Sequence, residues 1–404
     1  MIVNDRTSTK TTQRNGGLRA AVCAALALLM GCGEADPSAG EAEGVIAQRA
    51  DALESACSVT PPADVTTGTC RVDTTVTVGV ATASGCGSPA PLTGEVILRN
   101  GVPLNPPTPV VNGRVALAAG TNTVLWFLTA DRSVSAIQTV VVNPGLLSGQ
   151  SFQVGARASV GVITGSQSGP AGLFNAGAGP TSIGSDSFAG GVVSIGPVSV
   201  LDRAALSGGI LSAGAVTVAP SASVAGPVTP FGSFILPGLP ALPSFPAPAG
   251  GNVNVNSGVA RALAPNSYAS VNVSSGGTLV LAAGDYFFRS LIVNSGAVVT
   301  VAAAPPGSAN SATRVFVSNQ LVLSGPLQGP GGNSLIPTIV GYSGSGLLSL
   351  NNNFIGTFVA PNAELSLGAG GPRQFIGAFY ARVLRVNNDS QVLCNFLSAV
   401  GGQL

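Results

Sequence analysis

The chain of 404 residues contains no histidine, and its only lysine is Lys10. Without histidine, neither a Ser-His-Asp triad nor a Cys-His pair nor a histidine-ligated metal site can form. The single lysine lies in the amino-terminal segment that we expect to be cleaved off during export (see below). Serine–lysine catalysis and a GxxxxGK phosphate loop are therefore excluded as well. We therefore expect no catalytic residue, no metal and no cofactor.

Charged residues are also scarce, at 8% of the chain, against about 25% in an average globular protein. Asn, Ser, Thr and Gly supply the polar surface instead, as they do in long β-solenoids. Four of the 17 basic residues and one of the 16 acidic residues precede Cys32, which leaves 13 arginines against 15 carboxylates. Because nucleic acid binding needs clustered positive charge, we expect no nucleic acid partner.

The amino terminus has the pattern of an export signal. Four basic residues precede an apolar run, Ala20 to Met30, which is shorter than the roughly 20 residues of a membrane-spanning helix. Leu29-Met30-Gly31-Cys32 resembles the lipobox of bacterial lipoproteins. The resemblance implies a signal peptide over 1–31 and an acylated Cys32 that anchors the chain in the lipid bilayer, and Gly33 favours the outer membrane or cell surface. The alternative is ordinary secretion, with Cys32 an incidental thiol.

Residues 32–55 are small and acidic and include no aromatic residue, which is typical of a flexible tether. The cysteines beyond them are disulfide candidates, because exported proteins can form disulfides: Cys57, Cys70, Cys86 and Cys394. Four cysteines allow three connectivities, and the sequence does not choose among them. Three of the four lie close together, which favours one local bridge. Their spacing and the lack of histidine argue against zinc.

Residues 56–144 contain short β-rich runs separated by turn residues, which predicts a small antiparallel sandwich. The run Ala119 to Phe127, followed by Thr129-Ala130-Asp131 and Gln138 to Val142, resembles the closing hairpin of immunoglobulin-like hyalin-repeat modules. The resemblance implies an immunoglobulin-like β-sandwich. Trp126 is predicted to be a core residue, the alternative being a platform for sugar stacking.

Internal repeats begin after residue 145. Gly190–Val200 recurs as Gly208–Val218, and Phe354–Ala360 recurs as Phe375–Ala381. In both cases the offset between the two copies has the length of one coil of a parallel β-helix, with three short strands and three corners. In this register Phe354 lies over Phe375, Phe358 over Phe379 and Glu364 beside Arg385. The glycine midway between the aromatic residues is expected to leave room for their rings.

Three segments divide this region. Residues 145–226 are predicted to form the first part of the β-helix, and residues 253–404 its main part with a carboxy-terminal cap. Seven prolines fall within residues 227–252. Because proline cannot donate to a strand ladder, we expect an extended excursion or linker there, packed through Phe231, Phe234 and Phe245. The predicted fold class is thus all-β, with an immunoglobulin-like sandwich followed by a parallel β-helix.

Motifs in the last segment carry a third resemblance. Leu263-Ala264-Pro265-Asn266-Ser267-Tyr268, Leu279–Leu291 with its Gly284-Asp285-Tyr286, and Phe358–Ala363 resemble the β-helical domain of unknown function of bacterial pilus-associated and cell-surface proteins. The similarity covers about Gly251 to Asn395. It implies a parallel β-helix on the cell surface and brings no agreed catalytic residues. Asn266-Ser267 replaces the family's usual glycine before the tyrosine.

Five carboxylates lie beyond residue 145, and no two share one coil at strand spacing: Asp186, Asp202, Asp285, Glu364 and Asp389. Glycoside hydrolysis needs two carboxylates about 5 to 9.5 Å apart. We expect Asp285 to cap a corner turn and Asp202-Arg203 to form a solvated corner. Asn351, Asn352 and Asn353 are possible glycan contacts, the alternative being an asparagine ladder or corner turns.

These features favour a lipid-anchored cell-surface protein with a structural or adhesive role, whose β-helix acts as a spacer or contact surface, pilus- or envelope-associated. Its expected partners are the lipid bilayer, through Cys32, and envelope polysaccharide or surface proteins. The alternative functions are a carbohydrate-active β-helix enzyme, either a polysaccharide lyase or a hydrolase, and a glycan-binding module.

Overall fold

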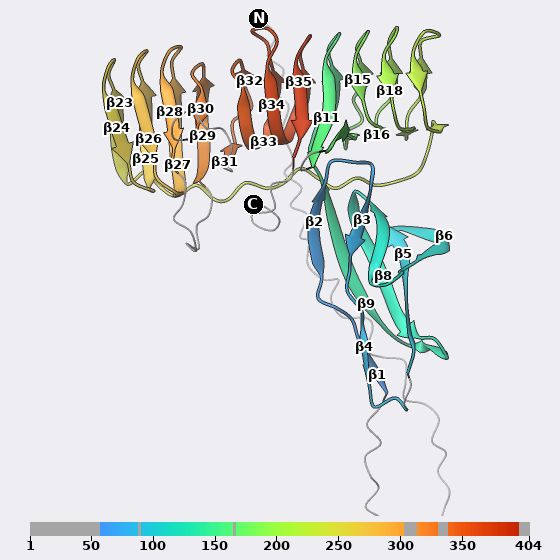
Figure 1. The fold of residues 1–404 in the computed structure, drawn as a ribbon. Helices are drawn as coiled ribbons and strands as arrows, with labels where there is room; N and C mark the ends of the chain where they lie inside the picture. Colours follow the sequence, from blue (N-terminus) through green and yellow to red (C-terminus); the bar gives the residue numbers. More distant parts are fainter. Residues whose placement is uncertain (1–56, 88–89, 165–166, 303–312, 330–337, 396–404) are drawn as a thin grey trace, which may run out of the picture. The chain divides into compact units, whose positions relative to one another are not determined.

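The computed structural model describes residues 57–87, 90–164, 167–302, 313–329 and 338–395 (Figure 1). Within these ranges the chain is all-β, as predicted, and forms no helix. No helix in the described ranges has the length and hydropathy that crossing a bilayer requires. The predicted signal peptide, Cys32 and the whole of the acidic tether lie outside the described residues.

The amino-terminal strands form one five-stranded sheet and two strand pairs. The sheet has the order β2 (Val65–Thr69), β9 (Asp131–Pro144), β8 (Gly120–Leu128), β5 (Leu92–Arg99) and β6 (Val102–Pro109). The pairs are β3 (Asp73–Thr77) with β7 (Arg114–Ala118) and β1 (Ser58–Thr60) with β4 (Thr82–Ser84). The expectation of a purely antiparallel arrangement is wrong, because β2 pairs with β9 in parallel.

Trp126 on β8 lies in the core of this part, with 3% of its surface exposed. Its Nε1 donates a hydrogen bond of 3.0 Å to Oε1 of Gln138 on the neighbouring β9. A buried indole needs such an acceptor, because an unpaired buried N–H is costly. The prediction of a core tryptophan is confirmed, and the sugar-stacking alternative is excluded by its burial.

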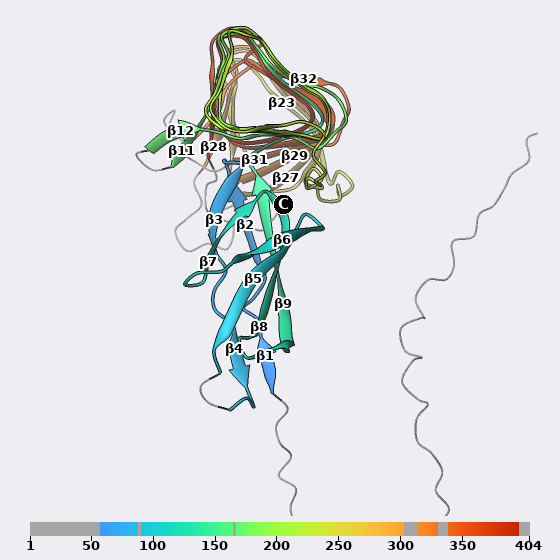
Figure 2. The same ribbon diagram turned by 90° about the vertical axis from the view of Figure 1, so that its right-hand side faces the viewer.

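The remaining strands form a parallel β-helix, whose coils superimpose as a three-sided ring when viewed along their axis (Figure 2). Its first half contains β10 (Leu146–Val154), β11 (Ser159–Thr164), β12 (Gln167–Pro170), β13 (Leu173–Asn175), β14 (Thr181–Ile183), β15 (Phe188–Ala189), β16 (Val192–Ser194), β17 (Val198–Val200), β18 (Ala205–Leu206), β19 (Ile210–Ser212), β20 (Val216–Val218), β21 (Ser223–Val224) and β22 (Val228–Thr229).

The second half contains β23 (Gly250–Val255), β24 (Ala260–Leu263), β25 (Ser267–Val273), β26 (Thr278–Leu281), β27 (Gly284–Val293), β28 (Val298–Val301), β29 (Thr313–Leu323), β30 (Leu327–Gln328), β31 (Thr338–Tyr342), β32 (Leu347–Leu350), β33 (Phe354–Leu367), β34 (Gln374–Val386) and β35 (Gln391–Cys394). In both halves the strands pair in parallel with their counterparts in neighbouring coils, apart from the hairpin partner β12. Among the strands that the structure describes, β30 pairs on one side only, with β28, and β32 on one side only, with β33. Apolar side chains point inward and form one continuous core.

The predicted registers of the two repeats are confirmed. Val192 pairs with Ile210 in the next coil, and Phe354 pairs with Phe375 as Phe358 pairs with Phe379. The predicted reason for the intervening glycine is wrong, however. Gly356 and Gly377 have φ angles of 145° and 142°, and a Cβ on Gly377 would run into the carbonyl oxygen of Gly356. Close approach of two backbones, rather than room for two rings, requires glycine there.

The order of the coils does not follow the sequence. β10 pairs with β13 and β14 on one side and with β34 on the other. In the same way β11 pairs with β15 and with β35. The first coil of the chain therefore lies in the middle of the solenoid, between the second coil and the last one (Figure 1). We call this contact between the two halves the junction.

Residues 230–249, which we call the strap, connect the two halves. The first half grows away from the junction and ends at β22, and the second half begins at the opposite end with β23 and grows back. The strap runs alongside the coils from one end to the other (Figure 1). It contains no strand, which agrees with its prolines.

Every third residue of the strap packs on the solenoid. Leu239 lies over Gly149 and Leu242 over Gly341, positions where a Cβ would clash with the leucine. The ring of Phe245 lies 6.1 Å from that of Phe287. A polyproline II segment rises about 9.3 Å per three residues, which is close to two coil spacings of about 4.8 Å. Leu242 and Phe245 accordingly lie two coils apart, over β31 and β27. Leu239, over Gly149 of β10, lies three coils from Leu242.

The side chains that receive the strap point outward from the coils and are apolar. Leu236 joins a buried cluster with Leu147, Phe174, Val193 and Tyr380. Phe231 was expected to pack there too, and that expectation is wrong, since 74% of its surface is exposed. Phe234 packs against this cluster as expected.

Two disulfides complete the fold. Cys57 is bonded to Cys86, the local bridge, and Cys70 is bonded to Cys394 across 324 residues of sequence. The second bridge fixes β35, at the junction, to the segment between β2 and β3. Beside it, the amide of Gly172 donates a hydrogen bond of 2.8 Å to the carbonyl oxygen of Cys70.

We predict that replacing Leu239 by Asp destabilises the protein by about 1–3 kcal/mol, because it removes apolar burial and places a charge against the coils. The matched control is Ala241→Asp, two residues along on the exposed side of the strap, which should change stability by less than about 0.5 kcal/mol. Urea unfolding followed by circular dichroism measures both. Equal effects of the two variants would contradict a strap that packs with a period of three.

Candidate functional site

Four charged residues line one corner of the solenoid, which we call the charged corner. Asp389, Arg157, Asp186 and Arg203 lie there in four successive coils, and each adopts a left-handed φ between 56° and 59°. The signs alternate along the row. The row also crosses the junction, since Asp389 belongs to the last coil of the chain and Arg157 to the first.

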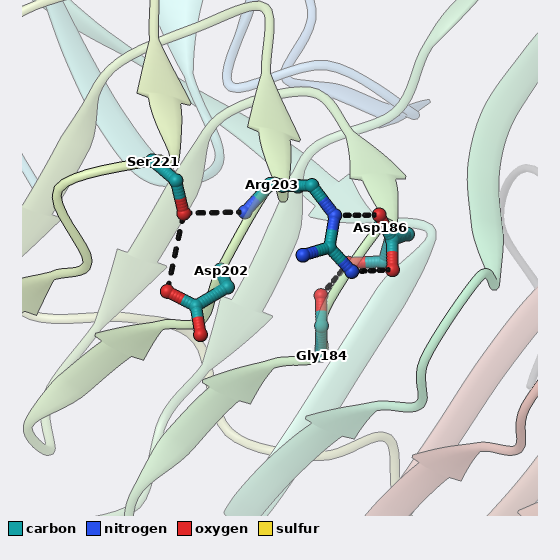
Figure 3. Close-up of polar contacts among 6 residues, drawn as sticks. Gly184, Asp186, Asp202, Arg203 and Ser221 are labelled. Carbon is teal, nitrogen blue, oxygen red and sulfur yellow. Dashed lines mark hydrogen bonds and ion pairs between the residues drawn. The ribbon is translucent and has the colours of Figure 1, made fainter.

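Two bidentate ion pairs link these residues. Nε of Arg157 lies 2.6 Å from Oδ1 of Asp389, and Nη2 lies 2.8 Å from Oδ2. Arg203 binds Asp186 in the same way, at 2.6 and 2.7 Å. Figure 3 shows the second pair, with Asp202 turned away from Arg203 and toward Ser221. The hydroxyl of Ser221 donates to Asp202 and accepts the amide of Arg203.

Hydrogen bonds from the arginines are the main cause of the lowered pKa values of two aspartates at this corner. Those from Arg203 hold the pKa of Asp186 below its usual range, and those from Arg157 do the same for the pKa of Asp389. Both carboxylates are therefore ionised and occupied by guanidinium groups over the physiological range. The arrangement suits the alignment of coils and leaves neither group as a proton donor.

The other carboxylates of the solenoid are paired as well. Asp285 forms a bidentate pair with Arg314, at 2.6 and 2.7 Å. The expectation that Asp285 caps a corner turn is wrong, since it lies within β27 and its partner lies opposite in β29. Glu364 binds Arg385 at 2.6 Å, as predicted. The predicted register is wrong at this point, because a shift after Ala360 places Glu364 opposite Val383 and Arg385 opposite Ser366. Asp202 and Arg203 do form a corner, but Arg203 forms its ion pair with Asp186 in the neighbouring coil.

The three asparagines singled out as possible glycan contacts lie at a corner before β33. The amide of Asn352 donates to the carbonyl oxygen of Ser324, and Oδ1 of Asn353 accepts the backbone amide of Gln374. The carbonyl oxygen of Asn351 accepts a hydrogen bond of 2.7 Å from Nε of Arg373. These bonds link neighbouring coils, so the arrangement favours corner caps over a glycan site.

Two tyrosines have strongly raised pKa values. Burial raises the pKa of Tyr286 to about 12, and it raises the pKa of Tyr380 further. Perturbed groups often mark functional sites, but each of these packs in a cluster of apolar side chains. The hydroxyl of Tyr286 donates to the carbonyl oxygen of Leu263. Their pKa values therefore report packing.

A groove of about 550 Å³ runs along the glycine-rich corners of the first half, beside Arg71 and Asp73. Gly172, Gly190–Gly191 and Gly208–Gly209 form part of its wall. Among the described residues no group of three or more His, Cys, Asp or Glu side chains could hold a metal ion. None of the described residues that line the groove is aromatic, so it offers no stacking surface for a sugar ring.

The sequence interpretation missed the charged corner, although a signal was present. Asp186 and Arg203 are separated by close to one coil length, and each precedes a short strand after a turn. The pairing of Arg157 with Asp389 carries no such signal, because 232 residues separate them.

No protein-family model, no curated protein and no solved structure matches the chain. The three resemblances stated above therefore remain predictions.

We predict that acid weakens the fold through the charged corner. Asp186 and Asp389 have lowered pKa values in the folded state, so their contribution is present above the ordinary Asp pKa of about 4 and is lost as pH falls through the lowered values. The melting temperature should fall between about pH 4 and pH 2, and less steeply in the double variant Asp186→Asn, Asp389→Asn. Identical profiles for the two proteins would contradict this assignment.

Proposed function

We propose that the protein is a lipid-anchored cell-surface protein whose β-helix is a rigid contact surface in the bacterial envelope. The anchor rests on the lipobox-like Leu29-Met30-Gly31-Cys32. The contact role rests mainly on one side of the solenoid. There Ser182, Ser199 and Thr217 stand in register in three successive coils of the first half. Asn272 and Asn254 stand in register in the two coils at the other end, and Arg385 and Ile292 interrupt the row between the two groups.

The chemistry of this column suits adhesion. Hydroxyl and amide groups both donate and accept hydrogen bonds, and they repeat at the strand spacing of about 4.8 Å. Polysaccharide hydroxyls and peptide groups are complementary to such a row. The junction bridge Cys70–Cys394 and the strap hold the coils together, which keeps the spacing fixed under load.

The anchor can be tested by mass spectrometry of the mature amino terminus in membranes of cells that process lipoproteins. We expect a first residue Cys32 that carries the mass of acyl chains. Cys32→Ala should abolish this mass, whereas Cys23→Ala, at a cysteine inside the apolar run, should leave it unchanged. A soluble chain with an unmodified Cys32 thiol would refute anchoring.

The contact role can be tested with the purified chain on an array of bacterial polysaccharides, together with an assay for released reducing sugar. We expect binding without release, weakened at least tenfold by Ser199→Lys in the column and little changed by Thr300→Lys on another side. Sugar release that Asp202→Asn or Asp285→Asn abolishes would instead identify an enzyme.

A further inference from the structure

The two ends of the solenoid differ in how they are closed. The coil of β20, β21 and β22 forms one end, which we call the open end. β20 pairs only with β17, β21 only with β18 and β22 only with β19. Among the described residues no strand pairs with their outer edges, and Figure 2, which looks onto this end, shows no element drawn across it.

The core is incompletely covered at the open end. Val216, Val218 and Val224 point toward the core and are only half-buried. At the opposite end, formed by the coil of β23 and β24, three inward residues are buried: Val253 is 5%, Val255 0% and Leu263 8% exposed. The open end therefore leaves three inward valines partly in water, whereas at the opposite end the three inward residues named above are buried and Val259 is 47% exposed.

The exposed strand edges at the two ends also differ in charge. Exposed strand edges are normally blunted by charge or proline, because they can pair with another chain. The opposite end carries Arg261, whose Nη1 donates to the carbonyl oxygen of Asn254 on the terminal strand. From Ala204 to Ala260 the chain has no charged residue at all. Pro220 and Pro227 lie outside β20 and β21, so both strands keep all their amides.

The junction shows what covers such an edge in this protein. There the outer edge of the coil of β10 and β11 is covered by another coil, that of β34 and β35, across a contact that the chain does not make continuous. A coil edge of this solenoid is thus closed by a second coil of the same kind. At the open end, a second copy of the chain would supply such a coil.

We propose that two copies of the protein dock open end to open end about a twofold axis. In a three-sided coil, an axis through the middle of one side brings β20 of one copy against β20 of the other, antiparallel and centred on Thr217, while β21 faces β22. Such an interface is self-complementary and closed. The opposite end has buried core residues and an arginine at its edge, which disfavours head-to-tail filaments. The proposal does not depend on the lipid anchor.

Disulfide trapping tests this geometry in the full-length chain, purified in mild detergent and oxidised. In an antiparallel pair the facing Cα atoms lie about 4.5 to 5.5 Å apart, within the range that a disulfide bridges. Thr217→Cys should therefore yield a covalent dimer from most of the chains. Ser199→Cys, its partner one coil deeper, would face its counterpart at about 14 Å, three strand spacings, and should remain uncrosslinked.

Sedimentation provides a second readout that needs no cysteine. The unmodified protein should show a concentration-dependent dimer, and Thr217→Lys should shift it to monomer by placing like charges opposite each other. Asn254→Lys, at the opposite end, should have no effect. A monomer at all concentrations, with no trapping at position 217, would overturn the proposal. Efficient trapping between a Thr217→Cys chain and an Asn254→Cys chain would also overturn it, because it would indicate head-to-tail association. Sedimentation uses neither acylation nor a thiol, so a failed anchor, which would leave the Cys32 thiol free to crosslink, would not obscure that readout.

Discussion

Backbone pairing between neighbouring coils is the constraint on which the rest of this structure depends. A coil cannot satisfy its amides and carbonyls alone, so each one requires a coil above and below. The chain meets this requirement without following its own order, because the strands of the last coil pair with those of the first. The core then runs without a break through the junction, and residues from both halves belong to one buried cluster.

Because the first coil lies in the middle of the solenoid, the chain must run once along the full length of the solenoid to reach the opposite end. The strap makes this connection. Its leucines recur at every third position, and a polyproline II segment advances about two coil spacings in that interval. The strap can thus cover one side of the solenoid without forming a strand. Its composition follows from the same match: proline fixes the extended backbone, and an uncharged segment can lie on apolar side chains without burying a charge.

The sequence predicted those parts of the fold that repeat locally. Phe354–Ala360 and Phe375–Ala381 share enough residues for their offset to fix the register of these segments. The same offset predicted the contact of Glu364 with Arg385, which forms although a bulge shifts the backbone register there. The junction was out of reach, because Leu147 pairs with Tyr380 without any similarity between their segments. The covered side of the solenoid did leave a signal. Strands such as β13 and β16 are buried at every position, and strands with apolar residues on both faces indicate a side that another element covers.

The charged corner explains how the junction forms at the correct place. Exposed ion pairs add little to stability, yet they can distinguish between competing contacts. The coil of β34 and β35 could in principle dock on either edge of the first half. At the junction, Asp389 meets Arg157, and the alternating row of charges continues. At the other edge the corresponding corner contains the neutral Ser221, already bonded to Asp202, so Asp389 would lose its guanidinium partner. The pairs thus select one order of coils from two that backbone pairing alone would allow.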